Sequence, residues 1–538
     1  MVKSAATTSY AIDFGTSNTL ITRWNALTQQ PETVSLSGLS QQLADNPPLI
    51  PSLVYVEDAR QGKIIVGQAV RDRGLDIAND PRFFSSFKRG IGTAMQGFLP
   101  ELDGITVTFE QVGQWFLQTA IAQLQAETND SLDSLILTVP VDSFEAYRNW
   151  LSGVARDLSV ERVRMLDEPT AAALGYDATD GDLLLVVDFG GGTLDLSLVR
   201  LDLGRGKKPQ GFILKWGEKS FGKDSAQKMK TARVLAKAGQ NLGGADIDNW
   251  LVDYFAETQG LPKSSLIARL AERLKIQLSA QPQASEAYFN DETFESYQLS
   301  LDRATFETLL EERNFFQQLD DLMVQVLQRG RLQGIEATDI DAVLLVGGTV
   351  RIPAVRTWVE QYFDREKIRC DSPFEAIARG ALQLSQGFEL KDFLYHSYGI
   401  RYWNRRENRH DWHSLIKAGQ PYPTADPVEL TLGASVENQP RIELIIGELG
   451  AETGGTEVYF DGDRLVTRSL NATETSVQPL NDSDGARTLA KLDPPGNPGR
   501  DRVKLRFRVD EQRFLRLTVE DILANQILLD NQFVAQLR

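Results

Sequence analysis

The chain has 538 residues, of which 42% are hydrophobic and 24% are charged, a composition typical of a soluble globular protein. Its formal net charge of −17 argues against general binding to nucleic acid or to anionic membranes. The single cysteine excludes an internal disulfide and favours a reducing compartment. Because the N-terminus lacks an apolar signal core and no apolar run reaches ~18 residues, we expect a cytoplasmic protein.

The first element expected along the chain is a strand–turn–strand unit at residues 10–21. An apolar run leads to Asp13, and a second apolar run follows a turn built from Gly15, Thr16, Ser17 and Asn18. Residues 31–75 indicate an extended, partly β insertion. The phenylalanines that precede Lys88 and Arg89 are interpreted as core of that region, and residues 110–127 have the apolar periodicity of a helix.

Two further strands are each expected to lead into a helix. One ends at Pro140, and the next ends just before Glu168 and Pro169. Proline suits the first turn of a helix and an acidic residue suits its positive end, which is a sufficient structural explanation of Glu168. The functional alternative places this carboxylate at the sheet edge where ligands collect in open α/β folds.

Residues 183–200 repeat the pattern of residues 10–21. A Leu/Val run typical of a strand buried on both faces leads to Asp188. The turn and second strand that follow contain Gly190, Gly191, Gly192, Thr193 and Asp195. Such glycines allow backbone N–H groups to cradle an anion, although a plain glycine hairpin explains a single copy equally well. Two copies favour a duplicated protein that grips a polyphosphate between two acidic hairpins.

Other patterns complete the reading of the chain. A protein kinase also carries a DFG triplet, but its VAIK and HRD motifs are absent, as are Walker A and GxGxxG patterns. Residues 204–240 are rich in lysine, and their second half has the pattern of an amphipathic helix. A solvated face explains this pattern, and a docking surface for an acidic partner is the alternative. Residues 341–355 predict a buried strand, a glycine pair and a helix. Beyond residue 385, alternating segments predict an antiparallel β domain with a loop at 473–502.

Four segments, in this order, resemble the DnaK-type heat-shock-70 (Hsp70) chaperone family. They are DFGTSNT at 13–19, DEPTAAALGYD at 167–177, VVDFGGGTLDLSLV at 186–199 and LLVGGTVRIPAV at 344–355. The resemblance implies an α/β actin-like ATPase with two duplicated ribonuclease-H-like lobes at residues 1–385. It also implies an interdomain linker at 386–397 and an antiparallel β-sandwich for substrate at 398–538. The family's helical lid has no counterpart after the last strand.

The resemblance also assigns roles by position to residues that would bind ATP or ADP with Mg²⁺. The catalytic set would be Asp13, Arg71, Glu168, Asp188, Thr193 and Asp195, of which Asp13, Glu168 and Asp188 would hold magnesium through water. The phosphates would meet Gly15, Thr16, Ser17, Asn18, Gly190, Gly191, Gly192 and Thr193. The adenosine would lie among Gly243, Gly244, Glu272, Lys275, Ser279, Gly347, Gly348 and Arg351. Pro140 and Arg148 would relay closure of the cleft to the next domain.

Three departures from the family pattern affect these expectations. Arg71 occupies the position of the family's catalytic lysine in VGQAVRDRG, and a planar guanidinium there would displace the attacking water and slow hydrolysis. Ile276 stands where the family stacks an arginine on adenine, which would weaken ATP binding by about 1 kcal/mol. Residues 403–412 replace a small apolar loop beside the peptide cleft with basic residues and tryptophans.

The expected function is therefore that of an ATP-dependent, slowly hydrolysing chaperone-like protein. Its partners would be unfolded peptides or a specific client protein, with a J-domain co-chaperone and a nucleotide exchange factor, and neither nucleic acid nor membrane. One alternative is a nucleotide-gated adaptor with little ATPase activity. A second alternative is a small-molecule kinase of the same fold, because fold alone does not settle function.

Overall fold

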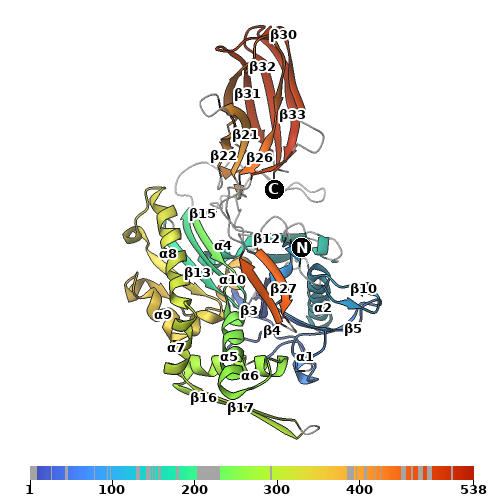
Figure 1. Cartoon of the computed structure of the whole chain (residues 1–538), viewed down its shortest axis with the longest axis vertical. Helices are drawn as coiled ribbons and strands as arrows, with labels where there is room; N and C mark the ends of the chain where they lie inside the picture. The colour runs from blue at the N-terminus through green and yellow to red at the C-terminus, as the bar shows by residue number, and fades with distance from the viewer. Residues whose placement is uncertain are drawn as a thin grey trace, which may run out of the picture. The chain divides into compact units, whose positions relative to one another are not determined.

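A computed structural model of the chain divides into two compact units, residues 1–390 with 456–469 and residues 391–455 with 470–538. The structure describes residues 9–25, 27–42, 46–77, 79–93, 95–96, 99–128, 132, 134–140, 147, 150–151, 153–155, 158, 160, 162–176, 181–202, 231–290, 294–383, 393–394, 397–404, 409–417, 420–424, 426–449, 456–461, 464–469, 477–480, 487–510 and 513–537. The chain is mixed α/β in the first unit and rich in strands in the second (Figure 1).

The first central sheet contains the first acidic hairpin. Its strands, in spatial order, are β12 (Arg162–Asp167), β11 (Ser134–Val139), β1 (Ser9–Phe14), β2 (Asn18–Asn25) and β3 (Gln30–Thr33), with β4 (Ile50–Pro51) also paired to β2. β1 is antiparallel to β2 and parallel to β11. The apolar residues of β1 and β11 are buried on both faces of the sheet, which explains their continuous apolar runs.

The second central sheet repeats this plan around the second hairpin. Its order is β15 (Thr231–Gln240), β14 (Leu194–Asp202), β13 (Leu183–Phe189), β18 (Ala342–Val346) and β19 (Ile368–Arg369). β13 is antiparallel to β14 and parallel to β18, as β1 is to β2 and β11. Each sheet therefore offers one strand–turn–strand unit whose first strand carries an aspartate near its carboxyl end.

A pair of helices packs between the two central sheets. α4 (Glu168–Gly175) lies on strands of the second sheet, α10 (Ala376–Gln383) lies on strands of the first, and the two helices pack against each other (Figure 1). A Cβ on Gly380 would lie 1.8 Å from the Ala171 carbonyl oxygen, and one on Gly175 would lie 2.0 Å from that of Ala376. Only glycine at both positions permits this close crossing, so the two sheets are held at a short separation.

Further helices and small sheets surround these two layers. The remaining helices are α1 (Gln68–Asp72), α2 (Phe109–Thr128), α5 (Gly244–Gln259), α6 (Ser265–Ala280), α7 (Arg303–Glu312), α8 (Phe315–Arg331) and α9 (Pro353–Val359), with 3₁₀ turns η1 (Phe87–Gly90), η2 (Ala337–Asp339), η3 (Gly348–Arg351) and η4 (Arg365–Lys367). The peripheral strands are β5 (Leu53–Asp58), β6 (Lys63–Val66), β7 (Phe83–Ser85), β8 (Met95–Gln96), β9 (Glu101–Leu102), β10 (Ile105–Thr106), β16 (Gln283–Asn290), β17 (Glu295–Asp302), β27 (Thr456–Asp461) and β28 (Arg464–Ser469). Among these described helices, none is both long and apolar enough to cross a membrane.

The second unit is built from antiparallel strands around its own apolar core. One sheet has the order β22 (Arg409–Ile416), β21 (Ser397–Asn404), β26 (Ile446–Leu449) and β29 (Val477–Pro479), and another has β24 (Val428–Gly433), β31 (Asp501–Val509), β32 (Phe514–Asp521) and β33 (Gln526–Gln536). Two pairs complete it, β25 (Gln439–Leu444) with β30 (Arg487–Gly496) and β20 (Phe393–Leu394) with β23 (Gln420–Pro421). Alternating residues of β31 and β32 face inward, as their alternating pattern predicts.

Three local expectations differ from the structure. Residues 231–240 form strand β15 rather than part of a helix, because their backbone pairs along the edge of β14 and this pairing overrides local propensity. Residues 487–496 form β30 rather than a loop. Residues 456–469 form a hairpin that pairs with β8 and belongs to the first unit. The rest of the lysine-rich segment and most of the expected linker lie outside the described residues.

A buried ion pair stabilises the second unit. Arg502 Nη2 lies 2.8 Å from Asp521 Oδ2, and their side chains are 7% and 2% exposed. Asp521 Oδ1 also accepts hydrogen bonds from the backbone N–H groups of Leu523 and Ala524. Although burial opposes it, the hydrogen bond from Arg502, together with those from the two backbone N–H groups, lowers the pKa of Asp521 below its ordinary value.

We predict that Asp521→Asn destabilises the second unit by about 3–5 kcal/mol at neutral pH, because it leaves a buried guanidinium without its anion. Hydrogen exchange of β31 and β32 peptides during urea unfolding measures this change. Asp530→Asn, on the exposed face of the same sheet, should change it by less than about 0.5 kcal/mol. The difference should shrink as the pH falls through the lowered pKa, because protonation removes the same charge; an equal effect of both variants would contradict the prediction.

Candidate functional site

One cavity of about 780 Å³ lies between the two acidic hairpins in the first unit. Most predicted site residues line it, namely Asp13, Gly15, Thr16, Ser17, Asn18, Arg71, Glu168, Asp188, Gly190, Gly191, Gly192, Thr193, Gly244, Glu272, Lys275, Ser279, Gly347, Gly348 and Arg351. Three others are not in its lining. Gly243 contacts Gly191 from behind the wall, Asp195 lies near the start of β14, and Pro140 directly follows β11. Arg148 lies outside the described residues.

The two hairpins touch each other directly at one side of the cavity. A Cβ on Gly191 would lie 1.9 Å from Ser17 Oγ, and one on Gly192 would lie 2.4 Å from Thr16 Oγ1. A Cβ on Gly243, just before α5, would in turn lie 2.4 Å from the Gly191 carbonyl carbon. Because a Cβ at these glycines would overlap its neighbours, glycine allows the two turns to lie in direct contact beside the cavity.

An acidic centre lies where the strands β1 and β13 meet helix α4. Asp13 comes from the end of β1, Asp188 from the end of β13 and Glu168 from the first turn of α4. Lys88, in the 3₁₀ turn η1, places its Nζ 3.1 Å from Glu168 Oε1. Thr138 Oγ1 donates a 2.8 Å hydrogen bond to Asp13 Oδ1. The centre therefore contains more carboxylates than cations.

The crowded carboxylates shift each other's ionisation. Burial, and then the charge of Glu168, raise the pKa of Asp13 to about 6. Burial raises the pKa of Asp188 well above its ordinary value, with further contributions from Glu168, Asp195 and Asp13. Burial opposes the charged form of Lys88, but Glu168, with smaller contributions from Tyr147 and Asp13, outweighs it and raises the pKa of that ammonium. Such an arrangement favours any added cation.

The structure corrects the expectation for Arg71. Its Nη2 lies 2.5 Å from Glu272 Oε2, and its Nη1 donates to Gln41 Oε1 at 3.2 Å. Arg71 in α1 is thus tied to helix α6, whereas the ammonium inside the acidic centre belongs to Lys88. The acidic centre does contain a lysine, so the premise that an arginine replaces it is wrong.

The ion pair with Arg71 also changes the pKa of Glu272. Although burial opposes it, the positive charge of Arg71 lowers the pKa of Glu272. Both side chains are mostly buried, at 14% and 24% exposure. The pair therefore joins α1 and α6 across the cavity as two ionised groups.

The other end of the cavity is formed by α5, α6 and the η3 turn. Lys275 Nζ lies 2.8 Å from both the Gly244 carbonyl oxygen and an Asp248 carboxylate oxygen. Ser279 Oγ donates to the Lys275 carbonyl oxygen at 3.0 Å. Ile276, on the same helix, is 41% exposed toward this space. This end thus combines a polar helix face with one apolar side chain.

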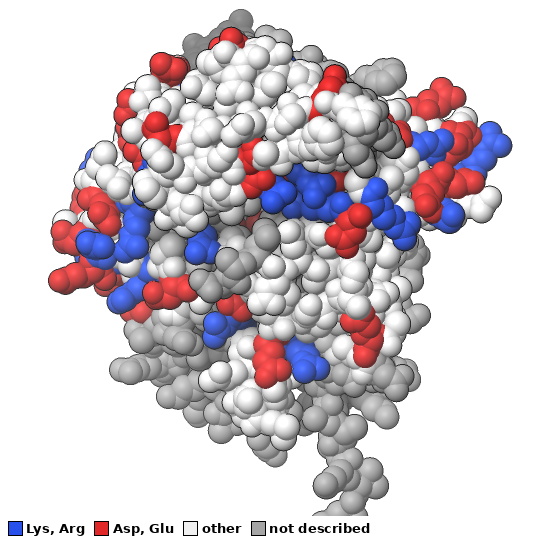
Figure 2. Space-filling view, turned by 90° about the horizontal axis from the view of Figure 1, so that it is seen from below, with Lys and Arg blue, Asp and Glu red and all other residues white. Residues whose placement is uncertain are grey.

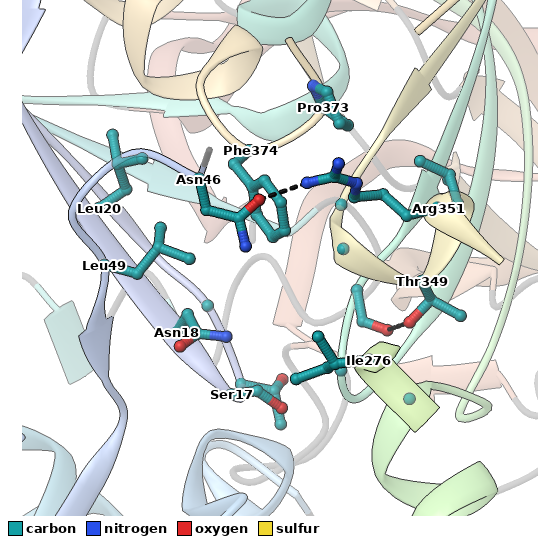
Figure 3. Close-up of a pocket in the computed structure, with 18 of the residues that line it drawn as sticks. Ser17, Asn18, Leu20, Asn46, Leu49, Ile276, Thr349, Arg351, Pro373 and Phe374 are labelled. Atoms are coloured by element: carbon teal, nitrogen blue, oxygen red, sulfur yellow. Dashed lines mark hydrogen bonds between the residues drawn. The ribbon is translucent and has the colours of Figure 1, made fainter. Parts of the chain in front are cut away.

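The wall opposite α6 contains Arg351, which bridges two parts of the first unit. Its Nη1 donates to Asn46 Oδ1, and its guanidinium carbon lies 5.9 Å from the centre of the Phe374 ring. Figure 3 shows the Arg351 side chain reaching toward Asn46 beside that ring. The adjoining Gly347 has φ of +86°, and a Cβ there would lie 2.4 Å from the Phe189 carbonyl oxygen, so this turn also requires glycine.

Several residues of this site were not predicted from the sequence. Lys88 was interpreted as part of an aromatic core, and its neighbour Arg89 forms a nearly buried ion pair with Asp246 while donating to the Gly192 carbonyl oxygen at 2.6 Å. Asn46 and Phe374 were also missed. The signal for Lys88 and Arg89 was weak but present, because two adjacent cations directly after a phenylalanine run are costly to bury without anionic partners.

The surface near this unit carries charges of both signs. On the face shown in Figure 2, basic side chains form a short band across the middle, with acidic side chains next to it. Side chains of both signs also lie at the left and right of the view. A broad area of uncharged residues adjoins the band. Among the described residues on this face, the basic and acidic side chains therefore lie close to one another rather than in separate patches.

The chain matches one protein-family description. The model of the Hsp70 protein family matches residues 50–208 and 230–404, which together make up more than half of the chain. The matched segments include the second acidic hairpin, Glu168, Lys88 and the Gly347–Gly348 turn. The chain therefore belongs to the Hsp70 family.

Proposed function

We propose that this chaperone-like, nucleotide-binding member of the Hsp70 family binds ATP or ADP with Mg²⁺ between the two acidic hairpins. We further propose that it hydrolyses ATP and couples nucleotide state to peptide binding by the β domain. The observation that carries the proposal is the direct contact of the two hairpins around an acidic centre. In that arrangement, glycine and hydroxyl residues of both hairpins line one cavity, and their backbone N–H groups would cradle a polyphosphate.

The residues of the acidic centre suit a hydrated magnesium ion. Asp13, Glu168 and Asp188 supply carboxylate oxygens that would accept hydrogen bonds from water of the ion, and the single ammonium of Lys88 leaves negative charge uncompensated. Among the described residues, no group of three His, Cys, Asp or Glu side chains is close enough to hold a metal ion directly. We therefore assign the carboxylates to water molecules of the ion, as expected for Mg²⁺ with a bound phosphate.

The chemistry would be phosphoryl transfer to water by positioning and electrostatics. Magnesium would neutralise charge on the phosphates when bound. Lys88 Nζ, held beside Glu168, would donate hydrogen bonds to the terminal phosphate and to the attacking water. Asp188 and Asp195, opposite each other in the β13–β14 hairpin, would accept hydrogen bonds from ordered water, and Thr193 would orient it. In this assignment Lys88 takes the catalytic role that the sequence had suggested for Arg71.

The adenosine would occupy the end of the cavity formed by α5, α6 and η3. Gly244, Gly347 and Gly348 allow close approach of a flat ring, and Glu272 and Lys275 lie within reach of a ribose. Arg351 would stack on one face of the base, and Ile276 would contact the other through van der Waals forces (Figure 3). Arg71, through its bond to Glu272, would close this end of the cavity.

The wider organisation is proposed on the same family basis. Residues 1–385 with the 456–469 hairpin would form an actin-like ATPase of duplicated ribonuclease-H-like lobes. Residues 398–455 with 470–538 would form a β-sandwich that binds peptide along strand edges. Closure of the cleft would pass through Pro140 and Arg148 to the linker. A J-domain co-chaperone and a nucleotide exchange factor are the proposed partners, and the cytoplasmic location stays a prediction.

The adaptor alternative loses part of its support, because it relied on Arg71 as a replacement for the catalytic lysine. The basic and tryptophan-containing segment 403–412 still favours it. Its described residues end β21 and begin β22, with Trp403 42% exposed, and residues 405–408 lie outside the described residues. One folded partner retained only with ATP would indicate an adaptor, and many unfolded clients would indicate a chaperone. The kinase alternative would require a substrate-dependent burst of ADP.

We predict that Asp188→Asn weakens binding of ATP and ADP in the presence of Mg²⁺ by about tenfold or more, because it removes a carboxylate beside the metal. Isothermal titration calorimetry with and without Mg²⁺ measures this. Glu366→Gln, at an exposed position away from the cavity, serves as the control. Nucleotide affinities equal to those of the wild type in Asp188→Asn would refute magnesium-assisted binding at this centre.

We predict that Lys88→Ala lowers the single-turnover rate of ATP hydrolysis by about 100-fold, since it removes a charged donor to the reacting phosphate. Arg71→Lys should change that rate by less than about threefold, because Arg71 lies on Glu272 outside the acidic centre. Rapid-quench assays at saturating ATP measure both rates. The reverse order of effects would return the catalytic role to Arg71.

We predict that the affinity for an extended fluorescent peptide differs at least about fivefold between ATP and ADP, within the usual range of coupling between two sites. Fluorescence anisotropy titrations of the full chain measure this difference. Asp188→Asn should remove the difference while leaving the affinity in the absence of nucleotide unchanged. A peptide affinity independent of nucleotide in the wild type would eliminate the coupling and leave nucleotide binding intact.

A further inference from the structure

A cluster of aromatic rings lies beneath the acidic centre. Phe14 stacks on Phe116 with ring centroids 5.6 Å apart, and lies 6.1 Å from Phe87 and 6.2 Å from Trp150. Tyr147 joins the cluster through Trp150, at 5.1 Å. Trp150 Nε1 donates to the Glu110 carbonyl oxygen at 2.9 Å, which anchors the cluster to helix α2. These rings therefore form a rigid apolar floor under the charged groups.

The ammonium of Lys88 lies between this floor and the carboxylates. Its Nζ is 5.8 Å from the centre of the Phe14 ring and 5.6 Å from the centre of the Tyr147 ring, both within cation–π range. Glu168 accepts its hydrogen bond at 3.1 Å. The Lys88 side chain is only 12% exposed, so rings replace much of the water that an ammonium normally keeps.

Tyr147 contributes to this arrangement through its ring rather than its hydroxyl. The residue is 1% exposed, and its buried Oη has no hydrogen-bond partner among the described residues. Tyr147 is also not part of the cavity wall. A buried hydroxyl without a partner contributes no stability, so the feature that justifies a tyrosine or phenylalanine here is the flat face presented to Lys88.

We propose that the rings of Phe14 and Tyr147 hold the Lys88 ammonium inside the acidic centre, and that Tyr147 is a positioning residue for this lysine. A lysine side chain has four rotatable bonds and a strongly hydrated head, so it leaves a crowded site readily unless something restrains it. The rings supply that restraint before any nucleotide arrives. The consequence for turnover rests on the proposed function, whereas the restraint itself does not.

The restraint is tested on the full-length protein without nucleotide, by acylation of lysines at one fixed pH and peptide mass spectrometry. Lys275 is the internal reference, because it lies in the same cavity with the same 12% side-chain exposure and is bonded to Asp248. We expect the acylation rate of Lys88 relative to that of Lys275 to rise at least about fivefold in Tyr147→Leu. A fivefold change corresponds to the loss of one cation–π contact of about 1 kcal/mol. Tyr147→Phe, which keeps the ring, should remain at the wild-type level.

Phe14→Leu provides a second variant that removes a ring from the other side of Lys88, in case Tyr147→Leu fails to fold. Thermal unfolding of each variant shows which of them retain the native fold. A folded Tyr147→Leu and a folded Phe14→Leu that both acylate like the wild type would overturn the restraint. A rise in Tyr147→Phe equal to that in Tyr147→Leu would overturn the assignment to the ring.

The positioning role is tested by single-turnover hydrolysis and by calorimetry with ATP and Mg²⁺. We expect Tyr147→Leu to hydrolyse ATP about tenfold more slowly with an unchanged dissociation constant, and Tyr147→Phe to hydrolyse it at the wild-type rate. Raised acylation with an unchanged rate would overturn positioning while leaving the restraint. A wild-type protein that binds no ATP would refute the proposed function, and the acylation result would still decide the restraint.

Discussion

The geometry of the first unit depends on the close crossing of helices α4 and α10. Gly175 and Gly380 bring each helix against the backbone of the other, and each helix packs on one of the two central sheets. The separation of the sheets is therefore set by backbone contact rather than by adjustable side chains. Because the acidic hairpins extend from those sheets, the same contact brings Gly191 and Ser17 together at the cavity.

The hairpins concentrate more negative charge than buried groups tolerate alone. Burial raises the pKa of Asp13 to about 6, and Lys88 provides the one ammonium found among the described residues of the centre. A buried lysine is itself costly, and in this protein the carboxylate of Glu168 and the flat faces of aromatic rings compensate that cost. The cation that stabilises these carboxylates is thus also the one to which the proposed mechanism assigns the contact with a phosphate.

The second unit has its own apolar core and its own buried ion pair. The proposed coupling of nucleotide and peptide would therefore act between two units that each have a separate core. Cross-strand pairing, rather than the local sequence pattern, made residues 487–496 of this unit a strand: they pair with β25 although they contain prolines and glycine. The same effect made residues 231–240 a strand of the first unit.

The sequence by itself determined the two hairpins, the Glu168–Pro169 helix start, the glycine pair at 347–348 and the family resemblance, because these depend on local patterns of apolar, acidic and glycine residues. Only the tertiary structure decided which cation enters the acidic centre. Arg71 and Lys88 lie 17 positions apart, and the phenylalanines that precede Lys88 are only a weak local sign that this cation, rather than Arg71, is buried among carboxylates. The choice follows from long-range packing, which places Arg71 against Glu272 and Lys88 over the rings of Phe14 and Tyr147.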